Sequence, residues 1–205
     1  MLLYVDSRYT SPYAMSVFVG LKEKNIPFEL RTIDLENGAN LRPEYVTESL
    51  TGRVPTLVDG NFSLSESSAI TEYLEEAYPG MALYPSDPKT KARARQVQAW
   101  IRSDLLPIRQ ERSTDVVFYQ PSQVPLSAAA EMASRILFRA SEALLAHNGD
   151  YLFGSWSIAD VDLALMLNRL ALNGDTVPKK LADYARRQWQ RPSVQEWVSL
   201  KRPKL

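Results

Sequence analysis

The fold of this chain is decided at Arg53-Val54-Pro55-Thr56-Leu57-Val58-Asp59-Gly60 and at Leu64-Ser65-Glu66-Ser67-Ser68-Ala69-Ile70. The first stretch reads as a strand that ends in a tight turn at Asp59-Gly60, which is a strong hairpin signal. At Val54-Pro55 a cis peptide bond lies only about 0.5–1 kcal/mol above trans. The second stretch opens a helix on polar residues, where unpaired backbone N–H groups and the helix dipole favour an anion. Together the two stretches predict a site for a peptide-like acidic molecule, recognised through its backbone and its carboxylate.

Residues 1–80 have the pattern of a small α/β unit built around this hairpin. An apolar strand over residues 2–5 precedes a helix with Ser11 as N-cap and Pro12 at its first position. Residues 28–33 alternate apolar and polar side chains like a half-buried strand, residues 42–50 are weakly patterned, and the last helix ends at Pro79-Gly80. The order β-α-β-α-β-β-α predicts a thioredoxin-like α/β domain over residues 1–80, with helices covering the sheet.

The rest of the chain reads as helical. Residues 81–90 carry two prolines and are interpreted as a linker, which leaves an all-α C-terminal helical-bundle domain over residues 91–205. Helices are expected over residues 88–119 with a kink at Pro107, over 127–147, over 157–172, and in two short segments within 178–200. Ser157 and Asp160 have the spacing of a capping box, which is a folding signal rather than a chemical one.

The amino-acid composition and charge of the chain exclude several classes of function. The 205 residues hold 24 Lys and Arg against 24 Asp and Glu, so the overall charge favours neither nucleic acid nor a membrane surface as a partner. No apolar run approaches the roughly 20 residues of a membrane span, and residues 1–6 lack a signal-peptide pattern, so a cytoplasmic location is expected. Because cysteine is absent, disulfides, Cys-ligated metal and an enzyme-borne thiol nucleophile are excluded, and no metal is expected.

The order and spacing of three sites resemble the glutathione transferases over nearly the whole chain. In that family the residue before the cis-proline, here Val54, pairs its backbone with the cysteinyl part of glutathione. An acidic-Ser pair, here Glu66 and Ser67, holds the γ-glutamyl end. Ser11 lies where the serine-type classes carry the residue that activates the thiol. The resemblance implies glutathione as co-substrate, a small electrophile or peroxide as second substrate, and a symmetric homodimer.

Ser11 is the candidate that activates the thiol. A thiol with a pKa near about 8.5 is only slightly ionised at neutral pH. One hydroxyl that donates a charge-assisted hydrogen bond to the thiolate is worth roughly 1.5–3 kcal/mol, or about one to two pKa units. Tyr4, Tyr9 and Tyr13 are close in sequence, and other classes of the family use a tyrosine, so these residues are the alternatives to Ser11.

Four further residues are candidate contacts of glutathione by position in the family pattern. Pro55 enforces the geometry of the Val54 backbone. Arg53 is a candidate for the glycyl carboxylate, with a solvated arginine as the alternative, and Asn40 is a weaker candidate. Asp104 lies on the long predicted helix, where a carboxylate in some relatives reaches the ligand's ammonium group across a dimer interface; the alternative is an ordinary exposed helical aspartate.

The resemblance predicts a serine-type, theta- or zeta-like transferase that conjugates glutathione to electrophiles or reduces organic peroxides with it. Residues 65–70, 98–105 and 114–118 are similar to a bacterial subgroup, the YfcF-type transferases, for which the resemblance implies both activities. Two alternatives stay open. One is a maleylacetoacetate-type isomerase, although the zeta class usually shows Ser-Ser-Cys where this chain has Thr10-Ser11-Pro12. The other is a non-catalytic binding protein on the same fold.

Overall fold

The computed structural model describes residues 1–147 and 149–205, and these form two compact units. The first unit comprises residues 1–83 and 192–205, and the second comprises residues 84–191. The helical pattern predicts residues 192–205 as part of the C-terminal domain, whereas the structure groups them with the first unit. The physical reason is that α10 (Pro192–Val198) packs against α1 (Pro12–Glu23), and its buried Trp197 stacks edge-on against Phe18 at 5.3 Å between ring centroids.

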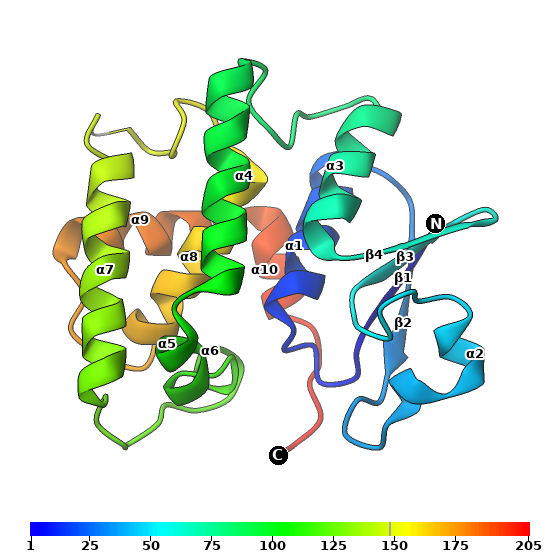
Figure 1. Ribbon diagram of the computed structural model, residues 1–205, viewed down its shortest axis with the longest axis horizontal. Coiled ribbons are helices and arrows are strands. Elements are labelled where there is room, and N and C mark those ends of the chain that lie inside the picture. The colour runs from blue at the N-terminus through cyan, green and yellow to red at the C-terminus, as the bar shows by residue number, and fades with distance from the viewer. Residues whose placement is uncertain (148) are drawn as a thin grey trace. The chain divides into compact units, whose positions relative to one another are not determined.

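A four-stranded mixed sheet with the order β2-β1-β3-β4 forms the centre of the first unit (Figure 1). Its strands are β1 (Leu2–Asp6), β2 (Glu29–Ile33), β3 (Thr56–Asp59) and β4 (Phe62–Ser65). On one side of the sheet lie α1 and α3 (Ser67–Ala77), and on the other lies α2 (Pro43–Val46), which follows the 3₁₀ turn η1 (Ala39–Leu41) (Figure 1). The predicted thioredoxin-like order of elements is confirmed.

The strand register brings three segments to one edge of this sheet. Tyr4 of β1 pairs with Thr56 of β3, and Thr56 pairs with Ser65 of β4. Because β3 is antiparallel to both neighbours, β1 and β4 end at the edge where β3 begins. The loop after β1, the residues before β3 and the start of α3 therefore share that edge.

Local signals explain where α1 begins and why it is central. The Oγ of Ser11 accepts the N–H of Ala14 at 3.2 Å and Pro12 opens the helix, as the sequence predicts. Residues 14–21 are buried without a break. The burial extends around the helix because α1 packs against β1, α3 and α10.

The second unit is helical. Its helices are α4 (Pro88–Ser103), α5 (Leu106–Glu111), α6 (Asp115–Phe118), α7 (Ala128–Leu144), α8 (Ile158–Ala171) and α9 (Lys179–Trp189). The single long helix expected over residues 88–119 is wrong, since this stretch forms three helices. Asp104 is extended and Leu105 has a φ of 58°, so the helix ends there, and Pro107 lies in the first turn of α5 instead of kinking a longer helix.

The predicted linker over residues 81–90 is also shorter than expected. Asp87 accepts the Thr90 N–H at 2.8 Å and caps α4, so residues 88–90 are helical. Leu83 and Tyr84 are fully or nearly fully buried. Burial of these two side chains therefore fixes the middle of the segment that connects α3 to α4.

Two buried polar groups organise the second unit. The predicted capping box is present, with the Asp160 carboxylate accepting the Ser157 N–H at 2.8 Å. The same carboxylate accepts the Tyr184 hydroxyl at 2.8 Å, which links α8 to α9. Arg112, 1% exposed, donates from Nε and Nη2 to the two carboxylate oxygens of Asp175 at 2.6 and 2.9 Å. Such bidentate pairs have strict geometry, so this contact closes the loop before α9 onto the end of α5.

To cross a bilayer, a helix of the described residues would have to be both long and apolar. None of these helices is both long and apolar enough to cross a membrane.

Candidate functional site

The loop after β1 carries Ser11 and is organised by a buried carboxylate. Asp6, 5% exposed, accepts the Thr10 N–H at 2.7 Å, the Thr10 hydroxyl at 3.0 Å and the Ser11 N–H at 2.9 Å. The Ser11 Oγ also caps α1 as an acceptor. A serine hydroxyl has one hydrogen to donate besides its two acceptor lone pairs. Capping the helix and donating to an anion are therefore compatible roles for Ser11.

The three alternative tyrosines have different surroundings. Tyr4 is buried against Tyr45 with 5.3 Å between ring centroids, and its hydroxyl accepts a bond from Arg31 at 3.2 Å. The Tyr9 ring packs edge-on against Trp197 at 5.9 Å. Tyr13 is half-buried in the first turn of α1. All three tyrosines stay alternatives to Ser11, and Tyr9 and Tyr13 lie two residues from it on either side.

The residues before β3 present main-chain groups beyond the end of the sheet. The Val54-Pro55 peptide bond is cis, and Pro55 is buried. Strand pairing of β3 begins at Thr56, so the N–H and C=O of Val54 lie outside the ladder. The chain just before them is held by the Arg53 carbonyl, which accepts the Tyr45 hydroxyl at 2.7 Å. An extended peptide can pair with such exposed main-chain groups as a further strand does.

Arg53 and Asn40 differ in what their side chains do. Arg53 is exposed. This exposure is compatible with a contact to the glycyl carboxylate of glutathione and also with a solvated arginine. The Asn40 amide donates to the Gly52 carbonyl at 2.8 Å. Asn40 therefore ties η1 to the loop before Val54, which is a supporting contact in addition to its predicted contact with a ligand.

Glu66 and Ser67 stand at the start of α3. Glu66 is exposed and holds a φ of 75°, a left-handed conformation that is uncommon for a residue with a side chain. Ser67 is 3% exposed and is the first residue of the helix. The first N–H groups of a helix have no partner within the helix. An unusual backbone at the entrance to such a helix end indicates a binding site more than a simple cap.

Of the predicted site residues, Asp104 is the one assigned to the other unit. It belongs to the second unit, where it ends α4, its side chain is exposed, and its carboxylate accepts the Ser103 hydroxyl at 3.3 Å. Its predicted contact with glutathione across a dimer interface is not tested by one chain, and it stays a prediction.

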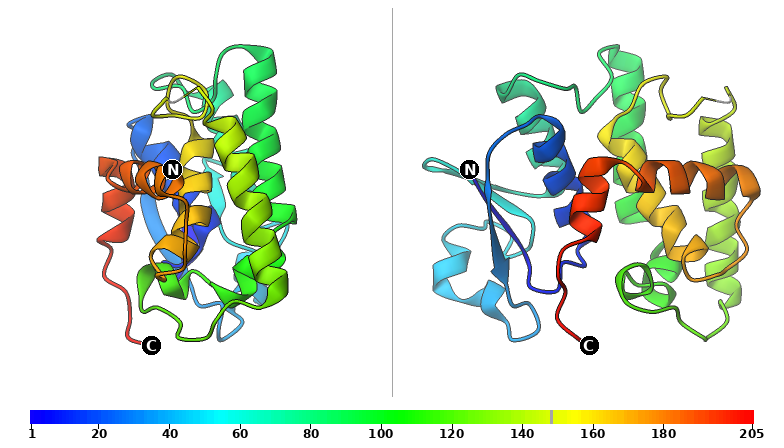
Figure 2. Two further views of the ribbon diagram at one scale, coloured as in Figure 1. Left: turned by 90° about the vertical axis from the view of Figure 1, so that its left-hand side faces the viewer. Right: turned by 180° about the vertical axis from the view of Figure 1, so that it is seen from behind.

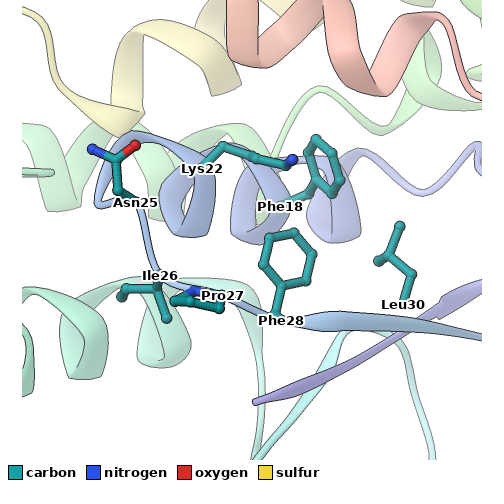
Figure 3. Close-up of a pocket in the computed structure, with 7 residues that line it drawn as sticks. All are labelled: Phe18, Lys22, Asn25, Ile26, Pro27, Phe28 and Leu30. Carbon is teal, nitrogen blue, oxygen red and sulfur yellow. The ribbon is translucent and has the colours of Figure 1, made fainter.

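A depression of about 500 Å³ lies elsewhere on the first unit (Figure 3). It is lined by Phe18, Lys22, Asn25, Ile26, Pro27, Phe28 and Leu30, none of which is a predicted site residue. Figure 3 shows the Lys22 ammonium directed toward the Phe18 ring, 5.5 Å from its centroid. Lys22 also pairs with Glu196 at 2.6 Å. Its charge is thus already neutralised, and this depression is not the candidate site.

Two residues of the site were missed from the sequence. Asp6 could have been recognised as a carboxylate that ends an apolar strand immediately before the Ser11 loop. Tyr45 holds both the Arg53 carbonyl and the Thr56 hydroxyl, at 2.7 and 3.0 Å, and burial raises the pKa of its phenol. No local pattern marks Tyr45, because its partners lie 8 and 11 residues further along the chain.

Comparison with known proteins agrees with this arrangement. The family models "Glutathione S-transferase, N-terminal domain" and "Glutathione S-transferase, C-terminal domain" match residues 7–82 and 87–202. A Burkholderia glutathione transferase homologue, whose crystal structure holds bound glutathione, is 46% identical with a TM-score of 0.78, over 96% of this chain and 95% of that one.

Two curated relatives are similar over different spans. Arabidopsis thaliana glutathione S-transferase T3 is 32% identical over 96% of this chain and 33% of its own length. Pseudomonas aeruginosa maleylacetoacetate isomerase is 39% identical over 53% of this chain and 51% of its own length. The matched region thus spans between a third and about half of the length of these relatives.

The chain belongs to the glutathione S-transferase family, with a thioredoxin-like N-terminal domain and a helical C-terminal domain. In residues 1–147 and 149–205, no three His, Cys, Asp or Glu side chains are grouped so that they could hold a metal ion.

Proposed function

We propose that this protein is a serine-type glutathione transferase. The observation that carries the proposal is the strand register, which places the Ser11 loop, the Val54 main chain and the start of α3 at one edge of the sheet. These are the sulfur, backbone and γ-glutamyl positions of the family pattern. Bound glutathione in the Burkholderia homologue supports the same ligand here.

Glutathione is held mainly through groups that the fold presents in advance. The Val54 N–H and C=O pair with the cysteinyl backbone, as a neighbouring strand would. The Ser67 N–H and hydroxyl hold the γ-glutamyl carboxylate at the positive end of α3, while Glu66 accepts a bond from the ammonium group. Arg53, Asn40 and a partner copy's Asp104 complete the proposed contacts.

Ser11 favours the ionised sulfur by donating its hydroxyl hydrogen to the thiolate, and the thiol proton leaves to solvent. In conjugation the sulfur bonds to an electrophilic carbon, and the leaving group departs with its electron pair. In peroxide reduction the sulfur attacks the terminal oxygen and the O–O bond breaks, which gives glutathione sulfenic acid and an alkoxide that takes a proton from solvent to become an alcohol. A second glutathione then yields glutathione disulfide and water. Because the chain has no cysteine, both sulfur atoms come from glutathione.

Glutathione-dependent isomerisation is the second candidate. Its support is the similarity of half of this chain to the P. aeruginosa maleylacetoacetate isomerase. An isomerase regenerates glutathione in each turnover, whereas conjugation consumes one molecule per product. Product analysis with limiting glutathione separates the two reactions. A cytoplasmic location stays a prediction.

The proposed site is tested by binding glutathione to wild type and to Glu66→Gln. Removing one charge-assisted hydrogen bond costs roughly 1.5–3 kcal/mol, so we expect an affinity loss of about 10- to 100-fold in calorimetric titration. Glu76→Gln is the matched control, because Glu76 is exposed on the same helix. It should leave the affinity unchanged.

The titration also tests the whole proposal. If wild type shows no binding at millimolar glutathione, the transferase is ruled out. If wild type binds glutathione but the pKa of the bound glutathione thiol is not lowered, the protein is a non-catalytic binding protein. Equal affinities of wild type and Glu66→Gln would remove Glu66 from the site while leaving the ligand in place.

The proposal includes a homodimer that uses the surface around α2. Leu41, Val46 and Leu50 lie within ten residues of one another and are 74%, 49% and 97% exposed. Apolar side chains exposed in a group mark interaction surfaces more often than isolated ones do. The usual dimeric state of the family agrees with this location.

Leu50→Asp should weaken this dimer at least about tenfold, because a buried unpaired carboxylate is costly. Sedimentation equilibrium measures the change. Val124→Asp is the control, since Val124 is 69% exposed in the second unit. A Leu50→Asp dimer as tight as wild type would exclude this surface, and a monomeric wild type would exclude the dimer.

A further inference from the structure

The C-terminal tail is part of the first unit and reaches the loop that carries Ser11. Seen from behind, α10 lies alongside α1, and the residues after α10 continue past the loop between β1 and α1 (Figure 2). The Ser193 hydroxyl donates to the Glu23 carboxylate, and Lys22 pairs with Glu196 at 2.6 Å. These contacts hold α10 against the last turn of α1, whose other end is capped by Ser11.

Arg202 connects this tail to the loop through backbone carbonyls. Its Nη2 donates to the carbonyls of Tyr9 and Trp197, both at 3.1 Å. Its Nη1 donates to the carbonyls of Val198 and Leu200 at 2.7 and 3.1 Å. Three of these four acceptors lie at or just beyond the end of α10, and carbonyls at a helix end lack partners within the helix. The fourth acceptor, Tyr9, is far away in sequence and two residues before Ser11.

The backbone at Tyr9 needs such support. Its φ of 52° is a left-handed conformation, which persists for a residue with a side chain only where the surroundings determine it. Its N–H donates to the Asp6 carbonyl at 3.0 Å and its ring packs on Trp197. Arg202 supplies the donor for its carbonyl. Tyr9 is thus held by the end of β1 on one side and by Trp197 and Arg202 on the other.

The loop is therefore held from two directions. The Asp6 carboxylate binds Thr10 and Ser11 from the sheet, and Arg202 binds Tyr9 from the tail. We propose that Arg202 is a positioning residue, which fixes the loop so that the Ser11 hydroxyl is directed at the glutathione sulfur. This inference rests on the proposed function. It adds that the residues after α10 help to set the reactivity of the glutathione thiol.

Arg202→Met tests the inference through the pKa of bound glutathione, followed by ultraviolet absorbance of the thiolate against pH. The variant should raise this pKa by about one unit, which reduces the thiolate fraction at neutral pH roughly three- to eightfold. A misplaced catalytic group can cost about 100-fold, so a one-unit shift is within reach of a loop displacement. Lys201→Met is the control, because it removes the same charge from the exposed neighbouring residue. It should keep the wild-type pKa.

The pKa is read only from folded protein with glutathione bound, so a loss of stability alone leaves it unchanged. A wild-type pKa in folded Arg202→Met overturns the inference and leaves the proposed function intact. If wild type itself does not lower the thiol pKa, the proposed function fails first. Should Arg202→Met not fold, Arg202→Lys carries the test, because lysine keeps the charge but lacks the planar fork. It should raise the pKa as well, and a wild-type value in this variant overturns the inference.

Discussion

Replacing Ser11 by alanine should raise the pKa of bound glutathione by about one to two units, which is the worth of one charge-assisted hydrogen bond to the thiolate. At neutral pH the thiolate fraction, and with it the rate of conjugation, should fall roughly 8- to 25-fold. The measurement is thiolate absorbance against pH in the presence of glutathione, together with kcat/KM.

The controls separate the hydroxyl from the helix cap. Loss of an N-cap serine costs about 0.5–2 kcal/mol of stability, so Ser11→Ala should also lower the thermal midpoint. Ser11→Asn keeps a capping side chain but not the hydroxyl, and should show the raised pKa with near-normal stability. Ser11→Thr keeps both and should resemble wild type. A lowered pKa that survives in Ser11→Ala and Ser11→Asn would point to one of the tyrosines, which Tyr4→Phe, Tyr9→Phe and Tyr13→Phe would then test.

Arg112→Met should produce a large loss of stability. The Arg112 guanidinium is buried and also donates from Nη2 to the Val124 carbonyl at 2.9 Å. Removing one partner of a buried pair costs about 3–5 kcal/mol, because the other charge, here Asp175, loses its cationic partner. For a chain of this size we expect the thermal midpoint to fall by roughly 10 °C.

A double variant distinguishes the cause of this loss. Arg112→Met with Asp175→Leu removes both charges and should recover much of the stability, because replacing a whole buried pair by apolar groups is often neutral. Arg135→Met is the control for arginine removal, since the Arg135 side chain is 60% exposed and its contact to Glu131 is long at 3.8 Å. It should leave the midpoint near that of wild type. If the thermal midpoint of the double variant is no higher than that of Arg112→Met, the loss of stability comes from lost packing and not from the remaining charge.

Sequence patterns predicted elements that depend on neighbouring residues. The hairpin at Asp59-Gly60, the cap at Ser11 and the capping box at Ser157 are present in the structure, because each is decided within about four residues. The prediction failed for residues 88–119. The apolar spacing there is helical throughout, and the sequence does not show that the backbone turns at Leu105 with φ of 58°.

The residues of the candidate site also differ in whether a local sequence pattern predicts them. Ser11, Val54, Pro55, Glu66 and Ser67 were found from local motifs and their order, and the strand register then placed their segments at one edge. Asp6 and Tyr45 were missed, because their partners are recognised only when strands and loops have been brought together. The predicted role of each of these residues still depends on the titrations above.

By itself the sequence determined the order of elements, the cap of α1, the hairpin and the polar start of α3, since short-range sterics and hydrogen bonds decide these features. Only the tertiary structure decided that residues 192–205 belong with the first unit and that Arg202 reaches Tyr9, 193 positions away. Contacts over such distances in the chain follow from packing of whole surfaces, which no local pattern contains. The end of the chain thereby supports the loop at its beginning.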